Sequence, residues 1–111
     1  MVNYNVVDPI ASMGGVIERM CGKVSSDIFY NHPIIQQVLT ADREVQRVAI
    51  SRWLSILLLA FSTYAGVNIN GYIIFANNIG DPDEWVAVVE REVMPFVSRN
   101  NVIVESYKYL T

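Results

Sequence analysis

The feature that most constrains this sequence is a run of 28 residues without a single charged side chain, residues 53–80. The run occupies a quarter of a chain of 111 residues. A domain of this size has a small interior and buries roughly 60–70% of the surface that its unfolded chain exposes. So much apolar surface must therefore enter the core, contact a partner chain or enter a membrane.

The composition predicts one domain, residues 1–111, that buries part of its surface against another subunit. Hydrophobic residues make up 52% of the chain and charged residues 17%, whereas about 25% of an ordinary soluble domain is charged. The net charge is −3 and the basic residues are dispersed along the chain. Nucleic-acid binding is not expected, because phosphates require a basic surface.

The sequence predicts no metal and no cofactor. It contains one cysteine and one histidine, whereas zinc and iron–sulfur sites require several such ligands. A lone cysteine forms no disulfide within the chain. The N-terminal residues lack the basic start and apolar run of a signal peptide. We therefore expect a cytoplasmic or virion-associated protein.

The apolar spacing that begins at Ile10 predicts a first helix over residues 9–30. Asp8 is suited to cap this helix, since its carboxylate accepts hydrogen bonds from the first free amides. The pair Gly14-Gly15 weakens the helix by roughly 1 kcal/mol per glycine relative to alanine. The pair indicates either a close helix contact or a break.

Two further helices are expected before the middle of the chain. Pro33 begins a short one, because its missing N–H is not needed in a first helical turn. The next covers residues 41–65 and ends at Gly66. Residues 53–61 within it are apolar on almost every side, which is typical of a buried helix.

Strands are expected on both sides of a fourth helix. Asn70-Gly71 between apolar residues predicts a β-hairpin over residues 65–76, because both turn residues must take positive φ. Residues 101–110 contain a β-branched run and predict a last strand. Alternation over residues 2–6 indicates a further short strand. The fourth helix, residues 82–94, is capped by Asp81-Pro82-Asp83-Glu84 and ends or kinks at Pro95.

These elements predict an α+β fold. A helical layer, with the long apolar helix at its centre, packs on a small and mostly antiparallel sheet that contains the 65–76 hairpin.

One stretch resembles a known family. Residues 67–99 contain the strand VNING, an asparagine-rich turn, the helix start DPDEW and an amphipathic helix that ends in arginine. This order is similar to the C-terminal segments of the tail tape-measure proteins of tailed bacteriophages. The resemblance implies a small viral assembly component and no catalytic residues. The chain departs from the family in length, since 111 residues cannot form a long ruler.

No group of residues in the sequence forms a recognisable catalytic set. Cys21 and His32 would make a nucleophile and base, but no third group is evident to orient them. A buried, structural cysteine is the alternative that we favour. A pocket between helix and sheet would draw on these two residues together with Tyr64 and Tyr72.

The leading hypothesis is therefore a non-enzymatic structural or interaction protein that self-associates. A small membrane-associated protein, holin-like or an accessory subunit, is possible but not favoured, because Asn68 and Asn70 are costly in lipid. A ligand-binding domain or cofactorless enzyme is the second alternative. The candidate interface residues are the large apolar and aromatic side chains Trp53, Leu57, Leu58, Phe61, Tyr64, Phe75, Tyr107 and Tyr109.

Overall fold

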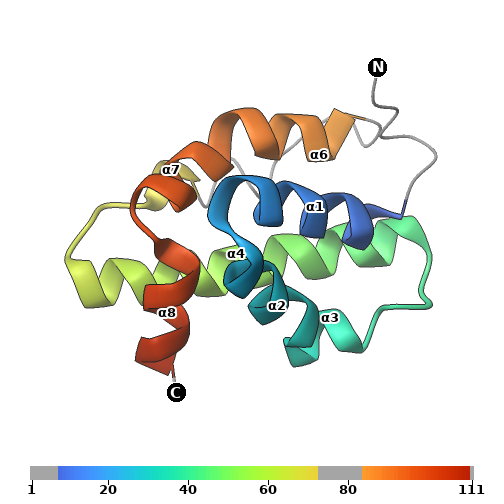
Figure 1. The fold of residues 1–111 in the computed structure, drawn as a ribbon, viewed down its shortest axis with the longest axis horizontal. Helices are drawn as coiled ribbons and strands as arrows, with labels where there is room; N and C mark the ends of the chain where they lie inside the picture. The colour runs from blue at the N-terminus through green and yellow to red at the C-terminus, as the bar shows by residue number, and fades with distance from the viewer. Residues whose placement is uncertain (1–7, 73–83, 111) are drawn as a thin grey trace.

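The chain folds into helices, and the predicted α+β architecture is wrong. The computed structural model describes residues 8–72 and 84–110, and within those ranges it contains helices and turns but no β-strand (Figure 1). The predicted N-terminal strand over residues 2–6 lies outside the described residues. The sheet that was to cover the long apolar helix is replaced by short helices.

The predicted helix over residues 9–30 is two helices, α1 (Pro9–Cys21) and α2 (Lys23–Asn31). Asp8 caps α1 as expected, since its Oδ1 accepts a hydrogen bond from the Ile10 amide at 2.9 Å. The break falls at Gly22, whose φ of 99° favours glycine. Gly22 donates its N–H to the Glu18 carbonyl at 3.0 Å, which closes the last turn of α1.

Gly14 lies within α1 and allows α2 to approach closely. A Cβ atom built at Gly14 would lie 1.9 Å from the Tyr30 hydroxyl oxygen, whereas one at Gly15 would meet no atom within 4 Å. The Tyr30 ring also packs edge-on against Phe29, with centroids 5.4 Å apart. The first glycine of the pair is therefore the close contact, and the second lies on an open surface.

Helix α3 (Pro33–Gln36) is short and leads into α4 (Arg43–Ala65), the predicted long helix. Asp42 begins α4 by accepting a hydrogen bond from the Val45 amide at 3.0 Å. Gly66 ends it in the left-handed conformation, with φ 69°. Gln46 is buried and donates its side-chain amide to the carbonyls of Val38 and Leu39. This side chain fixes the α3–α4 connection against the first turns of α4.

The predicted 65–76 hairpin is also wrong over the residues that the structure describes. Asn70-Gly71 lies in a helical turn instead, in which the Tyr72 amide donates to the Ile69 carbonyl at 3.0 Å. Asn68 starts this turn, since its side-chain oxygen accepts from the Asn70 amide. Tertiary packing supports the turn, because Ile69 is buried and Tyr72 stacks on Phe96. The rest of the hairpin lies outside the described residues, as do Asp81, Pro82 and Asp83.

The predicted 82–94 helix continues further than expected as α6 (Trp85–Val88), the π-helical turn η2 (Val89–Val93) and α7 (Met94–Arg99). Pro95 cannot donate a hydrogen bond to the Arg91 carbonyl, and its ring would clash there in a regular helix. The wider turn resolves this conflict, because the Met94 amide reaches back five residues to the Val89 carbonyl. The proline therefore widens the helix without ending it.

The predicted last strand, residues 101–110, is helix α8 (Val102–Leu110). Asn101 turns the chain into it with a positive φ of 53°. Val102, Ile103 and Ser106 are buried, which is the spacing of a helical face. Ser106 donates its hydroxyl to the Leu57 carbonyl of α4 at 2.8 Å. This contact with α4 holds a β-branched sequence in a helix.

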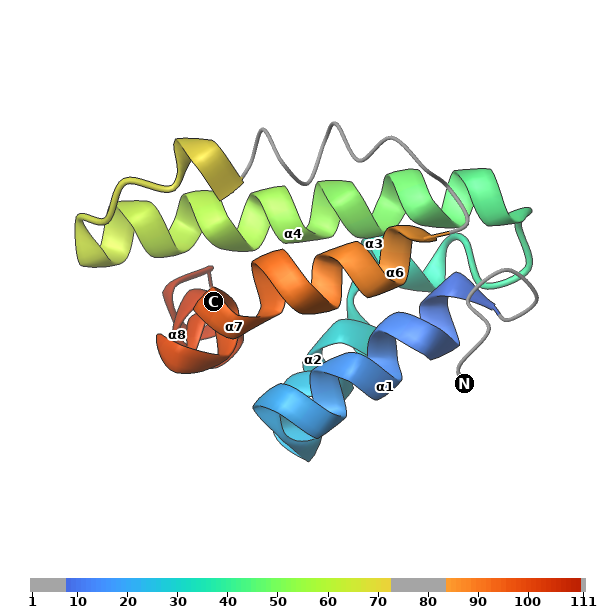
Figure 2. The same ribbon diagram turned by 90° about the horizontal axis from the view of Figure 1, so that it is seen from above.

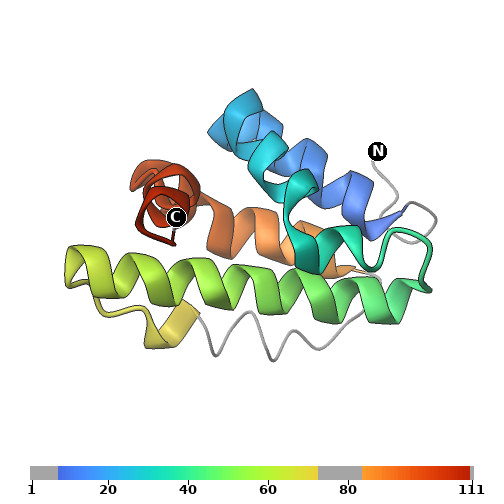
Figure 3. The same cartoon turned by 90° about the horizontal axis from the view of Figure 1, so that it is seen from below.

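Helix α4 is the centre of the fold. It contacts α1, α3 and α8, and α8 crosses it steeply (Figures 1 and 2). Seen from below, α4 extends along the whole length of the helical layer that covers it (Figure 3). Trp53 packs edge-on against Phe29 of α2, with ring centroids 4.8 Å apart, and Phe61 lies against Phe96 of α7. The most apolar part of the uncharged run is therefore covered by the chain itself.

Neighbouring leucines in α4 provide a test of this packing. Leu58 has an exposed fraction of 0% and Leu59 of 55%. We expect Leu58→Asp to cost about 4 kcal/mol or more, because it removes a buried leucine and places a polar group in an apolar core. Leu59→Asp should leave the free energy of unfolding nearly unchanged. Urea unfolding followed by circular dichroism measures both, and equal losses would contradict the described packing.

The glycine pair in α1 provides a second matched test. Gly15→Ala should raise the free energy of unfolding by about 1 kcal/mol, because alanine favours a helix and nothing obstructs its methyl group. Gly14→Ala should lower it, since the Tyr30 ring must move. In a Tyr30→Ala background, Gly14→Ala should become stabilising. The close contact would be refuted if Gly14→Ala stabilised the wild-type chain as much as Gly15→Ala does.

Candidate interaction surface

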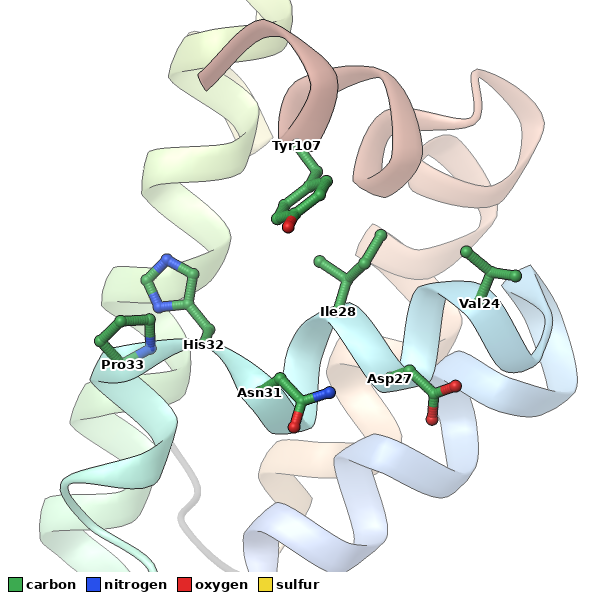
Figure 4. Close-up of a pocket in the computed structure, with 7 residues that line it drawn as sticks. All are labelled: Val24, Asp27, Ile28, Asn31, His32, Pro33 and Tyr107. Atoms are coloured by element: carbon green, nitrogen blue, oxygen red, sulfur yellow. The ribbon is translucent and has the colours of Figure 1, made fainter. Parts of the chain in front are cut away.

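A surface groove lies between α2 and α8, close to α4. Its volume is about 360 Å³, and Figure 4 shows the side chains that line it. Four of them come from α2 and one from α8, and the other two stand at the α2–α3 junction. The lining residues are Val24, Asp27, Ile28, Asn31, His32, Pro33 and Tyr107.

The floor of the groove is apolar. Val24 and Ile28 are four residues apart on α2, so their side chains lie one above the other on the same helix face. Both point toward α8, whereas Asp27 and Asn31 point away from Tyr107 (Figure 4). Val24 has an exposed fraction of 65%, and Ile28 packs partly against the core. The groove therefore presents aliphatic carbon to the outside at its base.

His32 provides a polar group at one end of the groove. Its Nδ1 accepts a hydrogen bond from the Ile34 amide at 3.1 Å, so the imidazole is the N-cap of α3. In the neutral ring the proton is therefore on Nε2, which remains able to donate. Burial lowers the pKa of His32 from its ordinary value, so the ring is neutral at pH 7.

The α8 side of the groove is aromatic and continues beyond it. Tyr107 lines the groove, and Tyr109 lies on the other edge of the buried face of α8, where its ring is 6.0 Å from that of Tyr64. Leu110 follows Tyr107 by three residues, so it lies on the next turn of the same side. All four side chains are about half exposed. Together with the two aliphatic residues of the groove floor, these four side chains are called the α2–α8 surface: Val24, Ile28, Tyr64, Tyr107, Tyr109 and Leu110.

The charges at the margin of the α2–α8 surface occur in opposite pairs. Lys23 donates to the Asp27 carboxylate at 2.6 Å on α2, and Lys108 lies 3.8 Å from Glu105 on α8. Each helix thus contributes one positive and one negative group. Among the described residues of α2 and α8, neither sign of charge is in excess.

The structure divides the interface candidates from the sequence into two groups. Trp53, Leu57, Leu58 and Phe61 are buried within the chain. The exposed candidates belong to the α2–α8 surface: Tyr64, Tyr107 and Tyr109. Phe75 lies outside the described residues.

Sequence reasoning missed Val24, Ile28 and Leu110 as surface residues. The two α2 residues continue the apolar spacing of α1, and a single helix over residues 9–30 would bury them with it. The break at Gly22 changes the direction of the chain and leaves Val24 exposed. The signal in the sequence that could have indicated this break is Gly22 followed by Lys23.

The candidates for a ligand pocket have different neighbours and do not share one site. Cys21 is half-buried in α1, where Ser98 contacts its thiol and burial raises the pKa of that thiol. Tyr72 stacks on Phe96, and Tyr64 pairs with Tyr109. Only His32 of this set lines the groove. Within residues 8–72 and 84–110, no three His, Cys, Asp or Glu side chains gather as a metal site.

Helix α4 has a second, smaller hollow and an exposed side. The hollow has a volume of about 230 Å³ and lies beside the first turns of α4. The residues that line this hollow are Val38, Glu44, Val45, Val48, Ala49 and Arg52.

Helix α4 is long and apolar enough to cross a bilayer, by length and composition only. The central helix of a helical core meets the same criterion.

Comparison of the chain with protein families, curated proteins and solved structures found no match. The resemblance of residues 67–99 to tape-measure proteins therefore stays a prediction.

The cap formed by His32 predicts a pH dependence of stability. Its pKa is lowered in the folded state, so the unfolded chain takes up a proton first as pH falls below about 6.5. The free energy of unfolding should therefore decrease from pH 7.5 to 5.5, at one fixed protein concentration. His32→Asn keeps a capping oxygen without titrating in this range. Wild-type and His32→Asn stabilities that change in parallel with pH would contradict this role.

Proposed function

We propose that this chain is a non-enzymatic helical interaction domain that self-associates through the α2–α8 surface. The observation that supports this most directly is that the exposed side chains of Val24 and Tyr107 line one groove, with Leu110 on the next turn of α8. Val24, Tyr107 and Leu110 are about half exposed or more, and they belong to two helices that lie side by side.

The arrangement of these residues matters more than their number. Single exposed apolar residues are ordinary on a protein surface, whereas a contiguous apolar patch around a concavity is typical of an interaction site. Tyrosine is favoured in such sites because its ring gives a large apolar contact and its hydroxyl tolerates water. Three tyrosines belong to the α2–α8 surface.

The chemistry of the described residues gives little support to catalysis. A nucleophile requires an adjacent base. Cys21 lies in α1 beside Ser98, while the Nδ1 of His32 is engaged by the Ile34 amide. Burial of Cys21 also favours the neutral thiol over the thiolate nucleophile.

Self-association is tested by light scattering after size exclusion at several protein concentrations. We expect a discrete oligomer in plain buffer, and we expect Val24→Ser or Leu110→Ser to raise its dissociation constant at least about tenfold, since each removes about 1.4 kcal/mol or more of apolar burial. Leu59→Ser is the matched control, because Leu59 is equally exposed but belongs to α4 away from the groove.

Two results would contradict the proposal. One is a wild-type monomer at every concentration. The other is a protein that remains in solution only with detergent, which would favour a membrane role for α4.

A further inference from the structure

We propose that His32 is a pH-sensitive switch for α3. The neutral imidazole holds the start of α3, and protonation of the ring lets α3 open away from α4 while the other helices stay folded. The switch does not depend on self-association, since it acts within one chain.

The first argument is that His32 accepts every backbone hydrogen bond that α3 donates. The Nδ1 of its ring accepts from the Ile34 amide at 3.1 Å. Its carbonyl oxygen accepts from the amides of Ile35 and Gln36, at 3.0 Å and 2.9 Å. Pro33, the first residue of α3, has no amide hydrogen to donate. The conformation of one residue therefore sets the whole helix.

The second argument is that a protonated ring is unable to hold this helix. An imidazolium carries a proton on both nitrogens and accepts no hydrogen bond. Its Nδ1–H would face the N–H of Ile34, so two donors would meet. The helix has four residues, and a helix of one turn is not stable in water without contacts from outside it. Protonation of His32 therefore removes a contact that α3 needs.

The third argument is that the chain after α3 is held separately. Gln46 of α4 donates its side-chain amide to the carbonyls of Val38 and Leu39, at 3.0 Å and 3.2 Å. These bonds do not involve His32 and remain when its ring is protonated. The opening is therefore limited to the residues between His32 and Val38, and α4 keeps its contacts with α1 and α8.

The closed form is favoured at neutral pH. Ile35 has an exposed fraction of 0%, and the Gln36 side chain donates to the Tyr30 carbonyl of α2. Opening exposes Ile35 to water and breaks the bond to Tyr30, so it has a cost that the neutral imidazole preserves. Loss of the cap lowers this cost without removing it.

The charges around His32 do not favour its protonated ring. Asp27 of α2 lines the same groove, but its carboxylate is bound by Lys23 at 2.6 Å. Tyr107 faces the groove from α8, and α3 contains no titratable side chain. The charged residues of α4 are Arg43, Glu44, Arg47 and Arg52. The lowered pKa of His32 results from burial and from none of these groups.

The direction of the response follows from this burial. Opening exposes the ring, so the pKa of His32 rises toward its ordinary value of about 6.5. The open form then binds a proton more readily than the closed form. The equilibrium constant for opening should therefore increase as pH falls below about 6.5, by at most about tenfold per pH unit. The increase ends once the pH is below the lowered pKa of the closed form.

Opening of α3 also changes the candidate surface. His32 and Pro33 stand at one end of the α2–α8 groove (Figure 4). When α3 moves, this end of the groove is lost and Ile35 becomes accessible. The groove is therefore complete at neutral pH and incomplete in acid.

Amide hydrogen exchange measured by NMR tests the switch, with each rate divided by the intrinsic rate at that pH. Ile35 and Gln36 report on α3, and Leu54 and Leu58 report on the core. We expect the α3 amides to exchange through a local opening that low concentrations of urea do not promote, whereas exchange of the core amides should accelerate with urea. Between pH 7.5 and 5.5 the opening constant of α3 should rise several-fold.

His32→Asn is the matched control, because asparagine caps a helix without titrating in this range. The opening constant of α3 should then be the same at pH 7.5 and 5.5. The switch would be overturned by α3 amides that have the urea dependence of the core, or by equal pH responses in the two chains. A ¹⁵N spectrum of the wild type in which the neutral ring of His32 carries its proton on Nδ1 would also overturn it, without any substitution.

Discussion

The need to cover one broad face of α4 determines the rest of this structure. Trp53, Leu54, Leu57, Leu58 and Phe61 are buried on one broad face of α4, which is wider than the stripe that a single neighbouring helix covers. The chain meets this need with short helices, of which α1, α3 and α8 each contact a different part of α4. The helices that cover α4 supply apolar contacts to its side chains, but they do not supply a hydrogen-bond acceptor to every buried polar group. Among the described residues, none accepts a hydrogen bond from the buried Trp53 indole N–H.

The sequence predicts the parts of this fold that depend on local signals. The end of α4 follows from Gly66, and the starts of α1 and α3 follow from Asp8 and Pro33, because caps and prolines act within one turn. The errors fall where a local preference is opposed by packing. Asn70-Gly71 favours a hairpin turn and residues 102–104 favour a strand. Burial of Ile69 and the hydrogen bond from Ser106 to α4 hold these segments in helical conformations instead.

Some residues of the candidate surface could be predicted from the sequence, and others could not. The sequence predicts Tyr107 and Tyr109 as contact residues because they are large aromatic side chains, although it places them on a strand. Val24 and Leu110 were not, since their exposure depends on where a helix breaks and where a neighbouring helix stops. Trp53 and Leu58 were predicted as contacts because a sequence does not show how much cover one chain gives itself. Whether an apolar residue faces a core or a partner is a property of the packed chain.

Helix α8 would join the stability of the chain to the proposed self-association. Its inner residues, Val102, Ile103 and Ser106, complete the cover of α4. Its exposed residues, Tyr107, Tyr109 and Leu110, form half of the α2–α8 surface. A nine-residue helix is too short to be stable alone in water, so it depends on the contact with α4. A partner that holds Leu110 would also hold the last turn of α8 against α4. A partner that binds only the folded chain stabilises it by mass action. Binding at α8 would therefore also raise the free energy of unfolding of the chain.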